Sequence, residues 1–263
     1  MSVKYDSIGI NYNCTRKADP YLLQRIYAHL NPETDKLYLD IGCGTGNYTT
    51  ALQRMGVHMI GIDPSETMLE NARAAGMEVQ WKIGMAENTG LESDSIDGIV
   101  ATLTIHHWPD LASGFSELSR VIRDGGRIVI FTSTPEQMEG YWLNYYFPVM
   151  LKQSMAQMPA LHKVTAAMES AGFAVLELEK YNVEPDLQDF FLYSGKHKPD
   201  LYLNPDIRRG ISSFSSLANA LEVEAGLKAL KEDMLSGKVE EVIQSYQNDS
   251  GDYLFIVGNK QRV

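Results

Sequence analysis

The chain has 263 residues, of which 44% are hydrophobic and 22% charged, so it can bury a substantial core and fits one globular domain with an insertion. Its formal net charge of −11 and its lack of a dense lysine and arginine run disfavour a nucleic-acid substrate, because a phosphate backbone would be repelled. No apolar run approaches the roughly 20 residues that span a bilayer, and the first residues lack the pattern of a signal peptide, so we expect no membrane contact.

The two cysteines, Cys14 and Cys43, indicate the compartment. Cys43 lies between closely spaced glycines, where a disulfide would block the turn, so the pair does not suggest an oxidising environment. We therefore expect a cytoplasmic protein.

Helix-like and strand-like segments alternate along the first half of the chain. The strand-like segments are apolar on both faces, as the buried strands of a parallel sheet are, and the segments between them have the period of amphipathic helices. Helices are expected over 20–30, 47–55, 65–76 and 110–122, and strands over 36–41, 57–63, 77–83, 94–103 and 126–133. This order predicts an α/β fold with a doubly wound, mostly parallel sheet.

The most informative motif is the run Leu37–Thr50, LYLDIGCGTGNYTT. A short strand carries Asp40 into three glycines, Gly42, Gly44 and Gly46, immediately before a helix. Glycine lets the backbone approach a ligand closely, and a helix start offers free N–H groups. The GxGxG spacing differs from the GxGxxG spacing of the dinucleotide fingerprint.

This acid and its GxGxG loop resemble class I S-adenosylmethionine-dependent methyltransferases, most closely the quinone-biosynthesis-type enzymes of the small-molecule branch. The resemblance covers roughly residues 35–135. It implies a Rossmann-like fold, S-adenosyl-L-methionine as the methyl donor and S-adenosyl-L-homocysteine as the product. It also implies that Asp40 takes the cofactor's ammonium, directly or through water, and that the glycine loop with Cys43 curls beneath the methionine and ribose.

A second acid stands at the end of the next predicted strand. Asp63 follows the first glycine of the loop by about 20 residues, the separation expected of a ribose-binding carboxylate. By the same resemblance, Pro64 opens the following helix and Met68 faces the adenine. Asp63 can also cap that helix, a role compatible with ribose binding.

The family's adenine-contact loop corresponds to residues 83–97, and in the family an acidic residue commonly precedes an alanine there. Here Met85 precedes Ala86, so we expect the Ala86 backbone or Glu87 to substitute for that acid. The loop as a whole is still expected at the adenine.

Two histidines and a tryptophan, His106 to Trp108, follow the strand that ends near residue 103. This sequence resembles the one found at the same place in the small-molecule branch of the family. Thr102 or Leu103 is expected close to the sulfonium. A neutral imidazole near pH 7 can accept the proton that a methyl acceptor loses, so His106 is the candidate general base. The alternative is that both histidines are structural, and we favour that interpretation for His107.

The leader before the first helix resembles a lid that folds over the bound cofactor in such enzymes. Arg16 is expected to pair with the methionine carboxylate. Tyr12 is expected to face the sulfonium or the acceptor, as a second catalytic candidate. A disordered leader without a role is the alternative. Residues 1–34 are thus a predicted lid and first helix.

The chain beyond Thr132 changes character. Thr134, Pro135 and Gln137 form a helix start of the capping-box type, and a helix rich in aromatic residues and methionines is expected over 134–158. Those side chains are either buried core or an adaptable apolar roof over the active site, and both can hold for different residues.

The remaining sequence predicts a core interrupted by an insertion. A helix over 160–172 and a strand over 173–183 would complete the cofactor-binding core, 35–183, and the last strand lies in 252–263. The family usually joins these strands by a tight hairpin, so residues 184–251 resemble an inserted cap that completes the acceptor pocket. A dimer contact or a purely structural role is the alternative.

The predicted chemistry needs no covalent nucleophile, because a sulfonium methyl group is intrinsically activated and the protein has to align the acceptor and exclude water. No GxSxG elbow and no CxxC pair occurs, so no metal is expected. The sequence predicts methyl transfer to the oxygen, nitrogen, sulfur or carbon of a small organic acceptor, and a homodimer is compatible with it. An NAD-dependent oxidoreductase, which should show GxGxxG, and a non-catalytic adenosyl-cofactor-binding protein are the alternatives.

Overall fold

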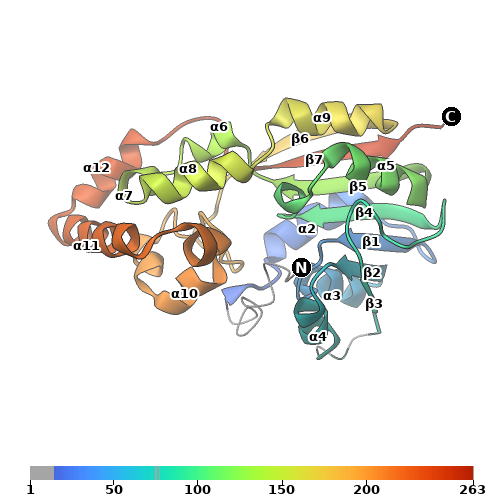
Figure 1. The fold of residues 1–263 in the computed structure, drawn as a ribbon, viewed down its shortest axis with the longest axis horizontal. Coiled ribbons are helices and arrows are strands. Elements are labelled where there is room, and N and C mark those ends of the chain that lie inside the picture. Colours follow the sequence, from blue (N-terminus) through green and yellow to red (C-terminus); the bar gives the residue numbers. More distant parts are fainter. Residues whose placement is uncertain (1–14, 75, 77, 263) are drawn as a thin grey trace.

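The computed structural model describes residues 15–74, 76 and 78–262, which form a seven-stranded sheet flanked by helices and a second group of helices beside it (Figure 1). The strand order is β3-β2-β1-β4-β5-β7-β6, in which β1 to β5 run parallel and β7 is antiparallel to β5 and β6. The strands are β1 (Leu37–Ile41), β2 (His58–Asp63), β3 (Gln80–Ile83), β4 (Ile96–Thr102), β5 (Ile122–Thr132), β6 (Phe173–Tyr181) and β7 (Tyr253–Lys260). The doubly wound, mostly parallel sheet expected from the sequence is confirmed.

The parallel register brings polar residues to one edge of the sheet. Asp40 of β1 is paired with Gly61 of β2 and with Val100 of β4. Asp63 and Thr102 close β2 and β4 a short distance further along, so both lie at the same carboxyl edge as Asp40. Ligands of open α/β sheets bind at this edge.

Helices cover both faces of the sheet. α2 (Pro20–Leu30) and α3 (Asn47–Arg54) pack on one face, and α5 (Leu111–Val121) and α9 (Leu161–Ser170) pack on the other. α4 (Glu66–Ala74) follows β2 and contacts β2 and β3. Side chains of a strand alternate between its faces, and each face of this sheet accordingly lies against its own buried apolar cluster.

Residues 134–158 form three short helices rather than the single helix expected from the sequence: α6 (Pro135–Met138), α7 (Leu143–Tyr146) and α8 (Pro148–Gln157). The predicted capping box is present at α6, where Thr134 and Gln137 bond each other's backbone N–H groups. The chain is interrupted before Pro148, because proline lacks the N–H that a continuing helix needs and is favoured at the first turn of a new one.

Residues 184–251 contain three further α-helices and two irregular turns, and with 134–158 they form a body that we call the helical lobe (Figure 1). Edge-to-face rings of Trp142 with Tyr202 and of Phe147 with Phe214 make its core. A Cβ at Gly226 would lie 2.4 Å from the carbonyl oxygen of Tyr146, so this glycine lets the longest helix of the lobe approach α7 closely. The elements of 184–251 are η2 (Pro199–Leu203), α10 (Pro205–Gly210), η3 (Ser213–Leu217), α11 (Ala220–Ser236) and α12 (Lys238–Ser245).

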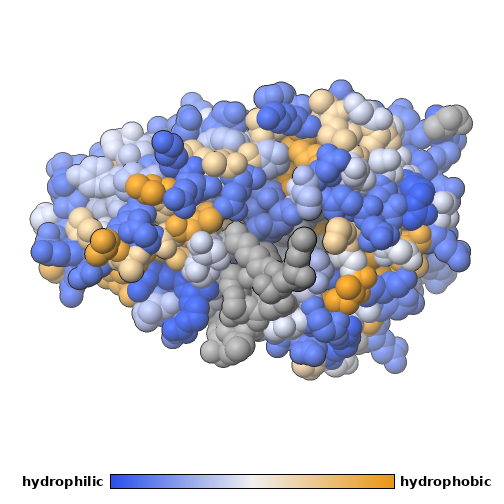
Figure 2. Space-filling view, viewed as in Figure 1, coloured by the Kyte–Doolittle hydropathy of each residue, from blue (hydrophilic) through white to orange (hydrophobic). Residues whose placement is uncertain are grey.

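The outer surface is mostly polar. On the face shown in Figure 2, hydrophilic residues predominate and apolar residues occur in small separate groups. Among the described residues, no helix has both the length and the apolar composition that crossing a bilayer requires.

Candidate functional site

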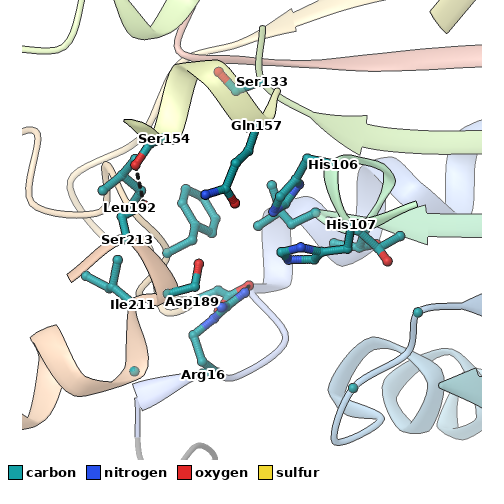
Figure 3. A pocket seen from close by; sticks show the side chains of 18 of the residues that line it. Arg16, His106, His107, Ser133, Ser154, Gln157, Asp189, Leu192, Ile211 and Ser213 are labelled. Carbon is teal, nitrogen blue, oxygen red and sulfur yellow. Dashed lines mark hydrogen bonds and ion pairs between the residues drawn. The ribbon is translucent and has the colours of Figure 1, made fainter. Parts of the chain in front are cut away.

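A cavity of about 430 Å³ lies between the carboxyl edge of the sheet and the helical lobe (Figure 3). Its size is that of an ordinary small-molecule pocket. Most of the residues predicted from the sequence to form a site line it: Arg16, Asp40, Gly42, Cys43, Gly44, Asp63, Pro64, Met68, Thr102 and His106. Gly46, Ala86 and Glu87 do not line this cavity, and Tyr12 lies outside the described residues.

The glycine loop after β1 has the backbone conformation that glycine favours. Gly42, Gly44 and Gly46 have φ angles of 70°, 54° and 73°. A Cβ at Gly42 would lie 1.9 Å from Thr104 Oγ1, and one at Gly46 would lie 2.2 Å from the Trp81 ring, whereas one at Gly44 would meet no protein atom within 4 Å. Gly42 and Gly46 therefore permit close packing, and Gly44 leaves open space.

Asp40 is a buried carboxyl behind this loop. It is 2% exposed, and its Oδ2 accepts a hydrogen bond of 2.6 Å from Thr49 Oγ1. Burial raises the pKa of Asp40 to about 7, although the Thr49 hydrogen bond opposes this rise. Near neutral pH the group therefore changes charge readily when a charged neighbour appears.

Asp63 connects β2 to the glycine loop and to the next helix. Its Oδ2 accepts from Gly44 N at 2.8 Å, and its Oδ1 accepts from Ser65 N at 2.9 Å. The carboxylate thus bonds the backbone at the turn into α4, as the sequence allowed, while it also lines the cavity.

The predicted adenine loop lies against the protein rather than in the cavity wall. Ala86 is 2% exposed and belongs to the apolar cluster beneath α5. Glu87 Oε1 accepts from Asp110 N at 3.2 Å. Met85, which carries no charge, is 47% exposed. The side of the cavity beside α4 is lined by Pro64 and Met68.

The end of β4 and the turn after it direct three polar side chains to the cavity. His106 and His107 belong to the short helix Ile105–His107, their ring centroids are 3.9 Å apart, and both rings point into the cavity in Figure 3. Thr102 Oγ1 is buried and has no hydrogen-bond partner among the described residues. Its bonding partner is then an ordered water or a ligand atom rather than one of the described residues.

Asp189 is a functional-site candidate that sequence reasoning missed. It is 2% exposed, lines the cavity, and forms an ion pair with Arg16, whose side chain is 15% exposed. Asp189 also accepts from the Tyr48 hydroxyl at 3.3 Å. No local pattern around Asp189 indicated this position, because its partners lie on distant parts of the chain.

Hydrogen bonds hold the segment around Arg16 between the helix that follows the glycine loop and the lobe. Asn47 Nδ2 donates to the Arg16 carbonyl oxygen at 3.0 Å, and Phe190 N donates to the Thr15 carbonyl oxygen at 3.1 Å. Gln188 N donates to Asp19 Oδ2 at 3.0 Å. The two sides of the cavity are therefore joined through residues 15–19.

The aromatic stretch 141–158 contributes both to the lobe core and to the wall of the cavity. Trp142, Phe147 and Met150 are buried in the lobe core. Tyr141 and Met158 line the cavity, together with Gln157 from the end of α8.

Outside the cavity, three side chains lie close enough together to be potential metal ligands. His29, Glu177 and Glu179 bring ligand atoms within 4.8 Å of one another. Arg25 already lies among them, since its Nε donates to Glu179 Oε1 at 2.9 Å and its Nη2 is 3.2 Å from His29 Nε2. This guanidinium gives the carboxylates a counter-charge, so the group is a salt-bridge network.

Comparison with known proteins identifies the family. The model of a methyltransferase domain matches residues 39–130. A crystal structure of a putative methyltransferase from an antibiotic biosynthesis pathway of Anabaena variabilis is 35% identical, with a TM-score of 0.83, over 92% of this chain and 98% of that one.

Curated relatives match over shorter stretches. An uncharacterized methyltransferase of Mycobacterium tuberculosis is 34% identical over 112 residues, 43% of this chain and 46% of the relative, so this chain spans about half the length of that protein. A demethylmenaquinone methyltransferase of Staphylococcus saprophyticus is 26% identical over 60% of this chain and 78% of its own. Together with the near-complete overlap with the Anabaena structure, these matches show that the chain belongs to the class I S-adenosylmethionine-dependent methyltransferases.

Proposed function

We propose that this chain transfers the methyl group of S-adenosyl-L-methionine to a small organic acceptor bound between the sheet edge and the helical lobe. The observation that carries the proposal is one cavity lined at one end by Gly44 and Asp63 and at the other by apolar side chains of the lobe. When bound, the cofactor supplies an electrophilic sulfonium methyl group. The protein's part is to align the acceptor and exclude water.

Several features of the sheet edge support binding of an adenosyl cofactor. The space in front of Gly44 is open, and the buried Thr102 hydroxyl lacks a partner among the described residues. In our proposal the backbone of Gly42, Cys43 and Gly44 lies beneath the methionine and ribose. Asp63 lines the cavity beside this loop and accepts from the ribose hydroxyls.

The ammonium and the carboxylate of the methionine group are each assigned to a side chain of opposite charge. Asp40 takes the ammonium, directly or through water, because a neighbouring cation favours the ionised form of a carboxyl whose pKa burial has raised to about 7. Arg16 pairs with the carboxylate while Asp189 holds its guanidinium in place. Tyr12 faces the sulfonium or the acceptor.

The adenine is assigned to the side of the cavity formed by Pro64 and Met68. Ala86 and Glu87 lie outside the lining, so their proposed part is to fix the course of the loop beside the adenine. Gly46 likewise acts indirectly, since its lack of a side chain admits Trp81 against the glycine loop.

His106 is the proposed general base. Its ring faces the cavity from the turn after β4, and a neutral imidazole can take the proton that an acceptor loses on methylation. His107 packs beside it and is assigned a structural role. The proposed contacts of the cofactor do not include His106. Loss of this side chain should therefore affect proton transfer and leave cofactor binding unchanged.

The cofactor assignment is tested by thermal unfolding with S-adenosyl-L-methionine, S-adenosyl-L-homocysteine and NAD. A ligand that binds only the folded state adds about 2.7 kcal/mol of stability at 100 times its dissociation constant. We expect stabilisation that grows with concentration for the two adenosyl ligands. Stabilisation by NAD alone would favour an oxidoreductase, and binding without methyl transfer would favour a non-catalytic cofactor-binding protein.

The base assignment is tested with His106→Ala and the matched variant His107→Ala. Incubation with a metabolite extract and isotope-labelled methyl donor reports turnover, and calorimetry with S-adenosyl-L-homocysteine reports cofactor affinity. His106→Ala should lower turnover by about 100-fold or more while cofactor affinity stays near that of the wild type. Wild-type turnover in His106→Ala would mark this histidine as structural.

A further inference from the structure

The charges that line the cavity are confined to its cofactor end. Among the described lining residues, the carboxylates are Asp40, Asp63 and Asp189. Arg16 is the one arginine among these described residues, and no lysine is present among them. Arg16 and Asp189 neutralise each other in an ion pair. Apart from this pair, no aspartate, glutamate, lysine or arginine of the described lobe residues lines the cavity.

The wall contributed by the lobe is largely apolar. Its side chains include Met138, Met158, Phe191, Leu192, Ile211 and Leu217. An anionic acceptor placed against this wall would lose its hydration without gaining a cation from the described lobe residues, and burial of an unpaired charge costs far more than burial of a neutral group.

Several hydroxyl groups in the wall are bonded within the protein. Ser154 Oγ lies 2.8 Å from Ser213 Oγ and donates to the Met150 carbonyl oxygen at 2.9 Å. Ser133 Oγ lies 2.9 Å from the Tyr141 hydroxyl. Burial raises the pKa of Tyr141 well above that of an ordinary phenol, so this hydroxyl stays neutral. These groups add no charge to the wall.

Gln157 gives the wall a polar group of a different kind. Its side chain extends from the C-terminal end of α8 into the cavity, on the side facing His106 (Figure 3). A primary amide both donates and accepts. It can therefore bond a hydroxyl, carbonyl or amide of an acceptor without requiring that the acceptor carry charge.

We propose that the acceptor is an uncharged, largely apolar molecule with one hydrogen-bonding group, and that Gln157 is a specificity-determining residue that bonds this group beside His106. This inference rests on the proposed function, since it names the acceptor class for the same cavity. A site built to bond a polar group discriminates against analogues that lack it. Apolar side chains of the lobe then bind the remainder of the molecule through burial.

The acceptor class is tested with ligands that share one ring system and differ in charge. The wild-type protein, saturated with S-adenosyl-L-homocysteine at pH 8, is titrated by calorimetry with 2-naphthol, 2-naphthoate and 2-naphthyl phosphate, and with the corresponding phenyl series. At this pH an ordinary imidazole is neutral. We expect the hydroxyl member of at least one series to bind about tenfold or more tightly than its two anions.

Equal or tighter binding of the carboxylate or phosphate would overturn the inference, and so would failure of both neutral ligands to bind. The first titration of the series, with S-adenosyl-L-homocysteine alone, separates the two proposals. Failure of that ligand to bind contradicts the proposed function. Its binding without a preference for the neutral acceptor analogue contradicts only the acceptor class.

The role of Gln157 is tested with Gln157→Met, which keeps the length of the side chain and removes the amide. The affinity for 2-naphthol should fall about tenfold, as expected for one lost hydrogen bond, while the affinities for naphthalene and S-adenosyl-L-homocysteine stay within about twofold. Gln153→Met is the matched control, because Gln153 is exposed on the same helix and does not line the cavity. Equal losses for naphthol and naphthalene would show that Gln157 only shapes the wall.

Discussion

The two sides of the cavity are built in different ways. On the sheet side, the lining comes from three short segments, 40–48, 63–68 and 102–107, and each begins where a parallel strand ends. On the lobe side, the lining comes from the short runs 157–158, 191–192 and 210–213 and from single residues between Ser133 and the first residue of β7, Tyr253. The sheet side carries the buried carboxyls Asp40 and Asp63. The lobe side carries apolar side chains, hydroxyls and Asp189, whose charge is paired with that of Arg16.

This difference teaches where each kind of specificity resides. Strand ends of a parallel sheet hold a few polar groups in fixed register, which suits a cofactor of constant structure. Helices that pack through apolar side chains can change their lining without changing the sheet, which suits variation in the acceptor. Substitutions on the two sides should therefore have separable effects on stability and on ligand affinity.

The largest effect is expected at Asp40, in the dependence of stability on pH. Burial raises its pKa from the ordinary value of 3.8 to about 7 in the folded chain. Because the folded state binds the proton more tightly than the unfolded state, the stability that this shift contributes is present below pH 3.8 and lost as the pH rises to about 7. A change of this size corresponds to about 4 kcal/mol. Asp40→Asn should therefore gain stability relative to the wild type between pH 4 and pH 8, as measured by urea unfolding.

Asp97→Asn provides a control of opposite sign. Burial alone would raise the pKa of Asp97, but bonds from the Leu37 N–H and from Arg123 outweigh burial and lower it. Its contribution to stability is thus present above the unfolded pKa and lost as the pH falls. Relative to the wild type, Asp97→Asn should lose stability as the pH rises. A pH-independent difference between Asp40→Asn and the wild type would contradict the assignment of a shifted carboxyl.

The next largest effect is expected from a single methyl group in the glycine loop. Gly44→Ala places a Cβ in the open space of the cavity, where no protein atom lies within 4 Å. The affinity for S-adenosyl-L-homocysteine should fall about 100-fold, because overpacking of this kind costs about 1–3 kcal/mol. Gly56→Ala is the control, since Gly56 also has a positive φ and an open surrounding but does not line the cavity. If both variants bind the ligand alike, backbone strain rather than the cavity accounts for any loss.

A smaller effect is expected when Asp63 loses its charge. Asp63→Asn keeps the size of the side chain but weakens its bonds to hydroxyl donors, so the affinity for S-adenosyl-L-homocysteine should fall roughly 20-fold, within the range of a charged hydrogen bond. Asp110→Asn is a matched control, because Asp110 also accepts from two backbone N–H groups, at 3.1 and 3.2 Å, on the surface. An unchanged affinity in Asp63→Asn, measured by calorimetry, would remove this residue from the site.

The sheet side could be predicted from the sequence because its signals are local. The strand carrying Asp40, the positive φ of the following glycines and the separation of Asp63 from that loop are all contained in one βαβ unit. The parallel register then places the strand ends together without further information.

The individual contacts of the lobe side could not be predicted, because they join distant parts of the chain. The ion pair between Arg16 and Asp189 spans 173 residues. Pro148 indicated one break in the predicted helix 134–158, because proline disfavours the interior of a helix. The apolar residues on both sides of Pro148 nevertheless favoured the prediction of one continuous helix. Ala86 packs in an apolar cluster and Glu87 accepts from Asp110 N, and no local pattern indicates either contact.

The smallest effect is expected when one methyl group is removed from the lobe wall. Ile211 is buried and lines the cavity, so Ile211→Val should lower the free energy of unfolding by about 1 kcal/mol and leave the affinity for S-adenosyl-L-homocysteine within about twofold. Ile99→Val, in the sheet core, should lower stability similarly and serves as the control. Urea unfolding and calorimetry measure the two quantities. A tenfold loss of cofactor affinity in Ile211→Val would show that the lobe wall belongs to the cofactor site, and the division between the two sides of the cavity would then fail.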